Sequence, residues 1–270
     1  MRGLWFPAAA RIALAYAGFS FVWILVGDRL ANNVSPGQSV RLAIEDAKGL
    51  AFVVLSSLLV YALVSRHEAH RRRSEREQQA VYDETLLGWA AALDLCDHST
   101  AEHTARVTEL TTRLAASLGY EGRGLELVKR GAMLHDIGKM GVPDEILRKK
   151  GPLTDGEWVQ MRRHPELAVG FLNGIAYLRE SLDIPWCHHE RWDGTGYPRG
   201  LAGTDIPFAA RIFSVIDVYD AVTSERPYRQ PLDHAAAMEL VREGSGTQFD
   251  PDVVAAFERL PLPGRHSHHV

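Results

Sequence analysis

Five of the twelve histidines and two of the aspartates in this 270-residue chain could together bind metal ions. These residues are His103, His135, Asp136, His164, His188, His189 and Asp217. Imidazole nitrogens and carboxylate oxygens are common ligands of zinc, iron and manganese in proteins. A lone histidine in such a pattern is more often a packing or surface residue, so the interpretation depends on the whole set.

The dipeptide His135-Asp136 is the centre of the pattern. It lies at the end of an apolar-periodic segment that is expected to be helical. Adjacent side chains on a helix diverge by about 100°, so a metal ion held by both needs further ligands from other elements. Seven ligands exceed the needs of one ion. The set therefore predicts two ions that share the Asp136 carboxylate.

Asp217 gives an argument that depends on burial. Residues 212–219 are apolar around the whole circumference of a helix, so this helix is expected to be buried. A buried carboxylate must be paired, protonated or bound to a metal, because isolation in an apolar interior is costly. Metal binding is the prediction, and an ion pair with Arg211 or Arg226 is the alternative.

The predicted cofactors are two divalent metal ions. Mixed imidazole and carboxylate ligation favours iron or manganese, with zinc as an alternative, over magnesium or calcium. Paired cations about 3.5–4 Å apart hold the oxygens of an in-line phosphoryl displacement and activate water at neutral pH. The predicted chemistry is therefore phosphoester hydrolysis.

Helix-start signals surround these residues. Capping boxes are expected at Ser99–Glu102 and Thr154–Glu157, and further helices are expected to start after Asp233 and Asp250. No alternating pattern of convincing length indicates a strand. The sequence predicts an all-α fold.

Two apolar segments near the N-terminus predict a membrane anchor. Residues 7–26 contain one charge and are long enough to cross a lipid bilayer, and residues 49–65 form a second apolar run. A cleaved signal peptide is the alternative for the first run. Arginines concentrated in residues 66–76 place the following chain in the cytosol. The prediction is a two-span hairpin with both termini cytosolic.

The predicted organisation has four parts. Residues 1–65 form the transmembrane hairpin, 66–96 a juxtamembrane linker helix, 97–262 the catalytic domain and 263–270 a flexible His-rich tail. The net charge of -4 excludes a general basic surface, so no DNA binding is expected. With only two cysteines, the chain carries neither a disulfide scaffold nor a cysteine zinc site.

Five motifs in order resemble the HD-GYP branch of the HD metal-dependent phosphohydrolases. They are LHDIGKMGVPDEIL, GPLTDGEWVQMRRHPE, HHERWDGTGYPRGL, ARIFSVIDVYDAVTSERPYR and GTQFDP. The resemblance implies an HD-domain helical bundle that hydrolyses cyclic di-GMP to pGpG and/or GMP. Together with the two apolar segments, it leads us to expect an enzyme anchored in the bacterial inner membrane. Six of the candidate metal ligands match metal ligands of that family, and His103 matches the histidine of its preceding helix. Asp136 and Lys139 match its catalytic centre.

The resemblance also implies substrate contacts. Lys139, Arg226, Gly196, Tyr197 and Pro198 match positions near the substrate in that family. A structural ion pair is the alternative for Arg226, and a purely architectural turn is the alternative for the loop. Members with a third metal tend to have a glutamate four residues before the first histidine. Ser99 stands there, which favours two metals.

Three other interpretations of the motifs are possible. The domain could be a receptor that binds cyclic di-GMP without rapid turnover, or an HD phosphohydrolase for another cyclic dinucleotide or nucleotide. It could also act as a scaffold whose GYP loop contacts diguanylate cyclases, a role that is compatible with catalysis. Pairing of linker helices in a homodimer is a further hypothesis.

Overall fold

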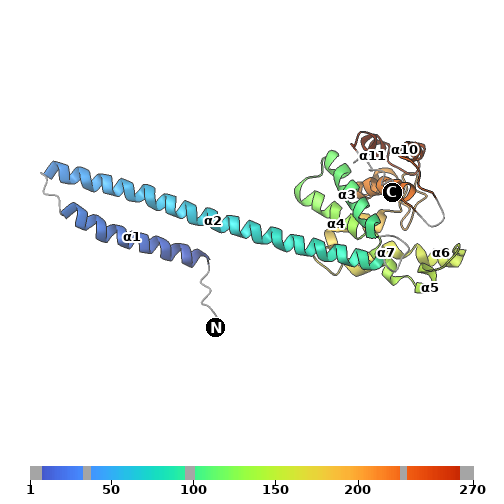
Figure 1. The fold of residues 1–270 in the computed structure, drawn as a ribbon, viewed down its shortest axis with the longest axis horizontal. Coiled ribbons are helices and arrows are strands. Elements are labelled where there is room, and N and C mark those ends of the chain that lie inside the picture. Colours follow the sequence, from blue (N-terminus) through green and yellow to red (C-terminus); the bar gives the residue numbers. More distant parts are fainter. Residues whose placement is uncertain (1–7, 33–37, 95–100, 226–229, 262–270) are drawn as a thin grey trace, which may run out of the picture. The chain divides into compact units, whose positions relative to one another are not determined.

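The computed structural model describes residues 8–32, 38–94, 101–225 and 230–261. Within these ranges the chain forms helices and no β-strand, which confirms the predicted all-α class (Figure 1). The α-helices are α1 (Ala8–Asn32), α2 (Gln38–Asp94), α3 (Ala101–Ser117), α4 (Gly122–Met133), α5 (Asp144–Leu147), α6 (Asp155–Met161), α7 (His164–Leu172), α8 (Asp183–Cys187), α9 (Phe208–Thr223), α10 (His234–Glu243) and α11 (Pro251–Glu258). Short 3-10 helices are η1 (Ile137–Gly141), η2 (Arg179–Ser181) and η3 (Gly203–Asp205).

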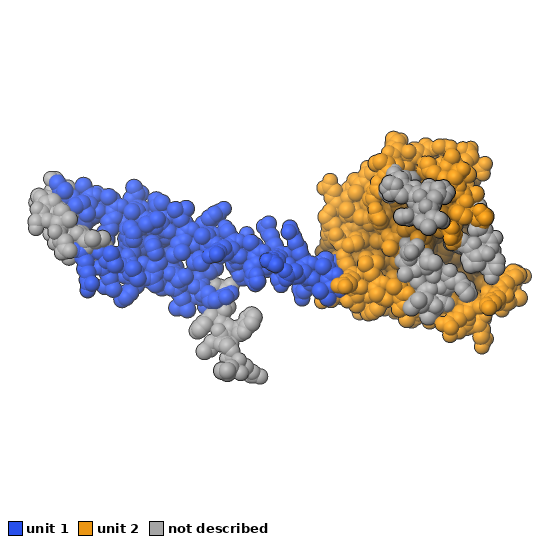
Figure 2. All heavy atoms as spheres, in the orientation of Figure 1, with its two compact units in different colours: residues 1–81 blue, residues 82–270 orange. Residues whose placement is uncertain are grey.

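The chain divides into two compact units, residues 1–81 and 82–270, which Figure 2 colours separately. Helix α2 contributes residues to both units. The division falls inside the predicted linker, and the predicted borders of the four parts remain predictions. The predicted His-rich tail lies outside the described residues.

In the first unit, α1 lies alongside the first part of α2 (Figure 1). The Phe19 and Phe52 rings stack at 6.0 Å between these helices, and Trp23 also contacts Phe52 at 6.0 Å. Both helices are long and apolar enough to cross a membrane. Their outer surfaces expose large apolar side chains, including Leu14, Phe21, Ile24, Leu50, Val53 and Leu58.

These helices are longer than the predicted spans. Helix α1 continues to Asn32 and α2 already begins at Gln38, so most of the polar segment between the two predicted spans, residues 28–48, is helical. Neither residues 28–32 nor residues 38–48 contain a proline or glycine that would interrupt a helix. Pro36 and Gly37 lie outside the described residues.

The second unit is built around α9. Its residues Ile212, Phe213, Val215 and Ile216 are all 0% exposed, and they pack among α3, α4, α8, α10 and α11. This burial on several sides explains why the segment is apolar around its circumference. Two carboxylates, Asp217 and Asp220, nevertheless lie on this helix.

The predicted helix starts in the described chain are confirmed. The Thr154 hydroxyl accepts from the backbone N–H of Glu157, whose carboxylate accepts in return from the Thr154 N–H, as a capping box requires. The carboxylates of Asp233 and Asp250 cap α10 and α11. The capping box predicted at Ser99 lies outside the described residues.

Gly138 allows η1 to lie against the start of α7. A Cβ atom at this position would overlap the carbonyl oxygen of His164 and lie 2.6 Å from the backbone nitrogen of Ala168. Because both obstacles are backbone atoms, a rotamer change cannot relieve the overlap. The side chains of Met133, Leu134 and Ile137 pack around this contact with Leu172.

We expect Gly138→Ala to lower the melting temperature of the full chain in detergent and to weaken its metal binding. Overpacking of this kind costs about 1–3 kcal/mol or more, because the backbones of η1 and α7 must separate. Gly170→Ala in α7 is the matched control, since a Cβ atom there meets nothing within 4 Å. A Gly138→Ala variant as stable as the control would contradict this account.

Candidate metal centre

The sequence predicted that the His135-Asp136 dipeptide lies at the end of a helix. In the structure it lies in the turn that follows the helix. Helix α4 ends at Met133, and Asp136 precedes the first residue of η1. Because the chain turns here, the two side chains approach each other, and His135 Nε2 lies 3.1 Å from Asp136 Oδ2. Both can therefore face the same pocket.

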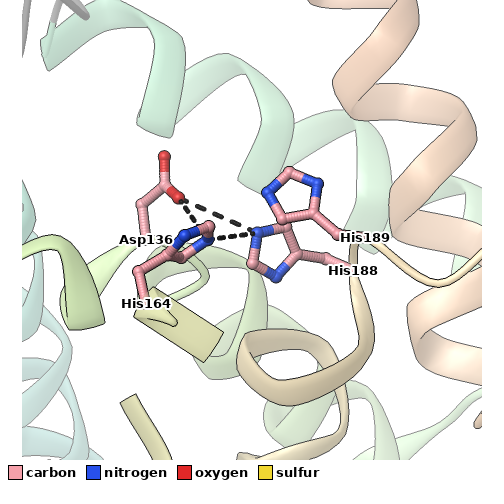
Figure 3. A group of neighbouring side chains, drawn as sticks. All are labelled: Asp136, His164, His188 and His189. Atoms are coloured by element: carbon pink, nitrogen blue, oxygen red, sulfur yellow. Dashed lines mark hydrogen bonds and ion pairs between the residues drawn. The ribbon is translucent and has the colours of Figure 1, made fainter. Parts of the chain in front are cut away.

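Four of the predicted ligands form one group: Asp136, His164, His188 and His189 each offer a ligand atom within 4.8 Å of the others. Figure 3 shows these side chains converging from three separate segments of the chain. His164 is the first residue of α7, and His188 and His189 directly follow α8. The fold therefore brings together side chains that are far apart in the sequence.

The other three predicted ligands form a second group. His103 of α3, His135 and Asp217 of α9 also offer ligand atoms within 4.8 Å of one another. Asp136 adjoins both groups, since its Oδ2 lies near His135 while its Oδ1 lies 3.4 Å from His164 Nε2. All seven predicted ligands are thus brought together around the Asp136 carboxylate.

Backbone carbonyls orient three of the imidazoles. The Nδ1–H groups of His135, His164 and His188 donate to the carbonyl oxygens of residues 132, 161 and 184 at 2.9–3.0 Å. A carbonyl oxygen can only accept, so each Nδ1 carries the hydrogen. In the neutral imidazoles the Nε2 lone pairs therefore face the pocket.

This arrangement fits a cation. Burial lowers the pKa of His164 and lowers that of His188 well below its usual range, so both rings are neutral. Their Nε2 atoms are 3.2 Å apart with no hydrogen between them. Asp136 Oδ1 is buried beside them and has no hydrogen-bond partner in the described chain. Three electron-rich atoms facing one another are what a metal ion would bring together.

The charges of the centre are divided between its two sides. Burial opposes a proton on His135, but the carboxylates of Asp136 and Asp217 outweigh it and raise the pKa of this imidazole to about 9. Burial and the neighbouring His164 lower the pKa of His189 to about 3. One side thus attracts positive charge strongly, and the other consists of neutral imidazoles around the shared carboxylate.

Asp217 is less buried than predicted. Its side chain is 25% exposed at the pocket, 3.6 Å from His103 Nε2, whereas Asp220 on the same helix is the fully buried carboxylate. An ion pair of Asp217 with Arg211 is absent from the described contacts, because Arg211 binds Asp250 at 2.5 Å. Arg226 lies outside the described residues.

The partners of Asp220 were not predicted from the sequence. Its carboxylate binds the Arg106 guanidinium through two bonds of 2.7 and 3.0 Å and lies 2.8 Å from His103 Nδ1. Although burial opposes ionisation, these partners hold the pKa of Asp220 well below its usual range. A polar residue three positions from a predicted ligand on a buried helix was the signal that could have indicated it.

The buried carboxylate of Glu190 holds the loop that follows His189. Glu190 is 3% exposed, and its carboxylate accepts backbone N–H groups of Arg199 and Leu201 at 2.8 and 3.0 Å. A Cβ at Gly196 would lie 2.6 Å from the Cα of Glu190, so only glycine allows this close approach. The loop is therefore held against the segment that carries two of the ligands.

An aromatic stack connects the loop to the metal centre. The Tyr197 ring stacks on His189 with centroids 4.6 Å apart, and the Arg162 guanidinium lies 5.3 Å from the centroid of Tyr197. Pro198 follows Tyr197 in the same loop, through a cis peptide bond. Lys139 lies on η1, with its Nζ 2.7 Å from Asp136 Oδ2. Arg162, an exposed residue at the end of α6, was not among the predicted site residues.

Comparison with known proteins identifies the fold. The HD domain family matches residues 90–253, which is more than half of the chain. The chain belongs to the HD domain family. The membership predicted from the motifs is confirmed, and for an HD domain a divalent metal site is expected at the convergent histidines and aspartates described above.

Several curated proteins resemble this HD protein. A cyclic di-GMP phosphodiesterase of Vibrio cholerae is 36% identical over 68% of this chain and 40% of its own length. One of Thermotoga maritima is 40% identical over 61% of this chain and 45% of its own length. A 3'3'-cGAMP-specific phosphodiesterase of Vibrio cholerae is 35% identical over 63% and 33%, respectively. The chain thus spans less than half the length of these relatives.

We expect metal binding to release a proton and to tighten as the pH rises from about 7 to about 9. Because the pKa of His135 is about 9, its imidazole carries a second proton in this range, and the incoming ion must displace it. Displacement of one proton makes the apparent affinity rise about tenfold per pH unit. Calorimetric titration of the metal-free chain with Mn²⁺ in buffers of different ionisation enthalpy measures the release. An affinity independent of pH in this window would contradict it.

Proposed function

We propose that this chain is a metal-dependent phosphodiesterase that hydrolyses cyclic di-GMP to pGpG and/or GMP. One observation carries the proposal: seven imidazole and carboxylate side chains form two neighbouring groups. The Asp136 carboxylate belongs to the first group and also lies next to His135 of the second. Two divalent ions, iron or manganese with zinc as the alternative, suit this set of ligands. The relatives named as cyclic di-GMP phosphodiesterases support the same activity.

The residues around the centre have distinct roles in this proposal. A bound pair of metal ions supplies Lewis-acid activation of the phosphodiester and of water. Asp136 connects the two groups of ligands, because one of its oxygens lies near His135 and the other near His164. Lys139, whose ammonium lies 2.7 Å from Asp136 Oδ2, offsets phosphate charge and donates a proton to the leaving oxygen. Burial raises the pKa of Tyr197, so its hydroxyl stays protonated and is available to donate to a substrate oxygen.

The substrate is proposed to bind over the loop that carries Gly196, Tyr197 and Pro198. The Arg162 guanidinium beyond Tyr197 offers a charged donor for the second phosphate or the base edge of a cyclic dinucleotide. Among described contacts, no carboxylate pairs with this arginine. Arg226 remains a proposed substrate contact on sequence grounds.

A second substrate is supported by the comparison. A relative with 35% identity is named as specific for 3'3'-cGAMP, and relatives named for cyclic di-GMP are 36% and 40% identical. These identities are too similar to separate the two substrates. The metal centre contacts phosphate in either case, so the choice between them depends on residues that contact the bases.

The N-terminal helices are proposed to anchor the enzyme in the bacterial inner membrane, with both termini and the catalytic domain in the cytosol. Length and composition allow both helices to span a bilayer, and little of either apolar window is buried within the protein. Large apolar side chains on the outer surface of a hairpin favour a lipid environment. Contact with diguanylate cyclases and pairing in a homodimer remain predictions.

The decisive experiment is a product analysis with the full chain in detergent, loaded with Fe²⁺ or Mn²⁺ without oxygen. We expect cleavage of cyclic di-GMP, and a loss of at least about 100-fold in Asp136→Ala and His188→Ala, since even outer partners of metal ligands cost about 10–100-fold. 3'3'-cGAMP is the parallel substrate. A metal-loaded, folded wild type that binds cyclic di-GMP but cleaves neither compound would contradict the proposal and favour a receptor.

We expect Arg162→Ala to raise the KM for cyclic di-GMP about tenfold or more while kcat changes little. Loss of a charge-assisted hydrogen bond to the substrate costs about 1.5–3 kcal/mol, mainly in binding. Arg163→Ala is the matched control, because this exposed neighbour has the same charge and has no described contact with Tyr197. Equal effects of the two substitutions would show only a general loss of positive charge.

A further inference from the structure

Four imidazoles of the candidate metal centre have described Nδ1 contacts, and they differ in what orients them. Three donate to backbone carbonyls, which no side-chain substitution removes. His103 instead contacts the carboxylate of Asp220, at 2.8 Å between Nδ1 and Oδ2. A carboxylate accepts hydrogen bonds only, so Nδ1 of His103 carries a hydrogen, and Nε2 is the nitrogen that faces Asp217 and the centre.

Asp220 is itself fixed in place. It is 1% exposed, and its two oxygens bind Nε and a terminal nitrogen of Arg106 at 2.7 and 3.0 Å. Ser224 contributes a further bond of 3.2 Å to Oδ2. Because Arg106 and His103 lie one turn apart on α3 and Asp220 lies on α9, this cluster fixes the direction of the ring across the two helices.

We propose that Asp220, clamped by Arg106, is a positioning residue that controls occupancy of the side of the metal centre formed by His103, His135 and Asp217. The proposal rests on the metal centre of the proposed function. Outer carboxylates of this kind fix the ring orientation of a ligating histidine and raise its basicity. On the other side of the centre, His164 and His188 obtain their orientation from the backbone, so loss of Asp220 leaves that side intact.

The test measures bound Mn²⁺ in the full chain in detergent, by equilibrium dialysis without oxygen followed by elemental analysis. We expect two Mn²⁺ per chain in the wild type and one in Asp220→Asn, with the second ion bound at least about tenfold more weakly. Electron paramagnetic resonance gives an independent readout, since the signal of a coupled manganese pair should be replaced by that of isolated Mn²⁺. His103→Gln should reproduce both changes.

A matched control separates positioning from a general loss of stability. Asp250 is a second buried carboxylate, 3% exposed, that pairs with Arg211 of α9 at 2.5 Å and has no described contact with a histidine. Asp250→Asn therefore removes a comparable buried ion pair. We expect this variant to lose stability and still bind two Mn²⁺.

A double variant addresses the charge left on Arg106. Asp220→Asn alone leaves a partly buried guanidinium whose charge could repel a metal ion, whereas Arg106→Gln with Asp220→Asn removes both charges. We expect the double variant to bind one Mn²⁺. The proposal would be overturned if folded Asp220→Asn or the folded double variant bound two Mn²⁺ with wild-type affinity. It would also be overturned if Asp220→Asn and Asp250→Asn lost Mn²⁺ equally. A folded wild type that binds neither Mn²⁺ nor Fe²⁺ would instead overturn the metal centre.

Discussion

The close approach of two imidazole nitrogens is the constraint on which the arrangement of this domain depends. His164 and His188 bring their Nε2 atoms within 3.2 Å although both Nδ1 atoms already donate to backbone carbonyls. Lone pairs that face each other without a hydrogen are unfavourable, and the neighbouring Asp136 Oδ1 adds a third electron-rich atom. A divalent cation converts this unfavourable contact into ligation, so folding and metal binding are expected to be coupled.

The remainder of the domain holds these atoms in place. The apolar surface of α9 anchors α3 on one side and α8 on another, which brings His103 and His188 toward the same region. Gly138 lets η1 approach α7 closely enough for Asp136 to reach His164. The packing therefore holds close together polar groups that repel one another in the absence of a cation, and its stability offsets that repulsion.

The sequence was sufficient to predict which side chains converge but not the geometry of their convergence. Histidine and aspartate side chains are few enough, and the motifs specific enough, that all seven predicted ligands fall into the two groups of the structure. The positions of His135 and Asp136 after the end of α4 could not be predicted, because the apolar period continues past the last helical turn. Burial of Asp220 and partial exposure of Asp217 depend on which side of α9 faces the pocket, which composition does not reveal.

Specificity must originate outside the ligand set. A centre of imidazoles and carboxylates contacts phosphate oxygens, and these are identical in every cyclic dinucleotide. Relatives named for different cyclic dinucleotides are nearly equally similar to this chain, as expected if a few residues around a common centre decide the substrate. The stack of Arg162, Tyr197 and His189 is where we propose that such residues lie in this protein. Because Tyr197 stacks directly on His189, a predicted ligand, we expect a substitution there to alter the metal centre as well as the proposed contact with a base. Under the proposed function, we expect substitutions at Arg162, one layer further out, to change substrate preference without changing the chemistry.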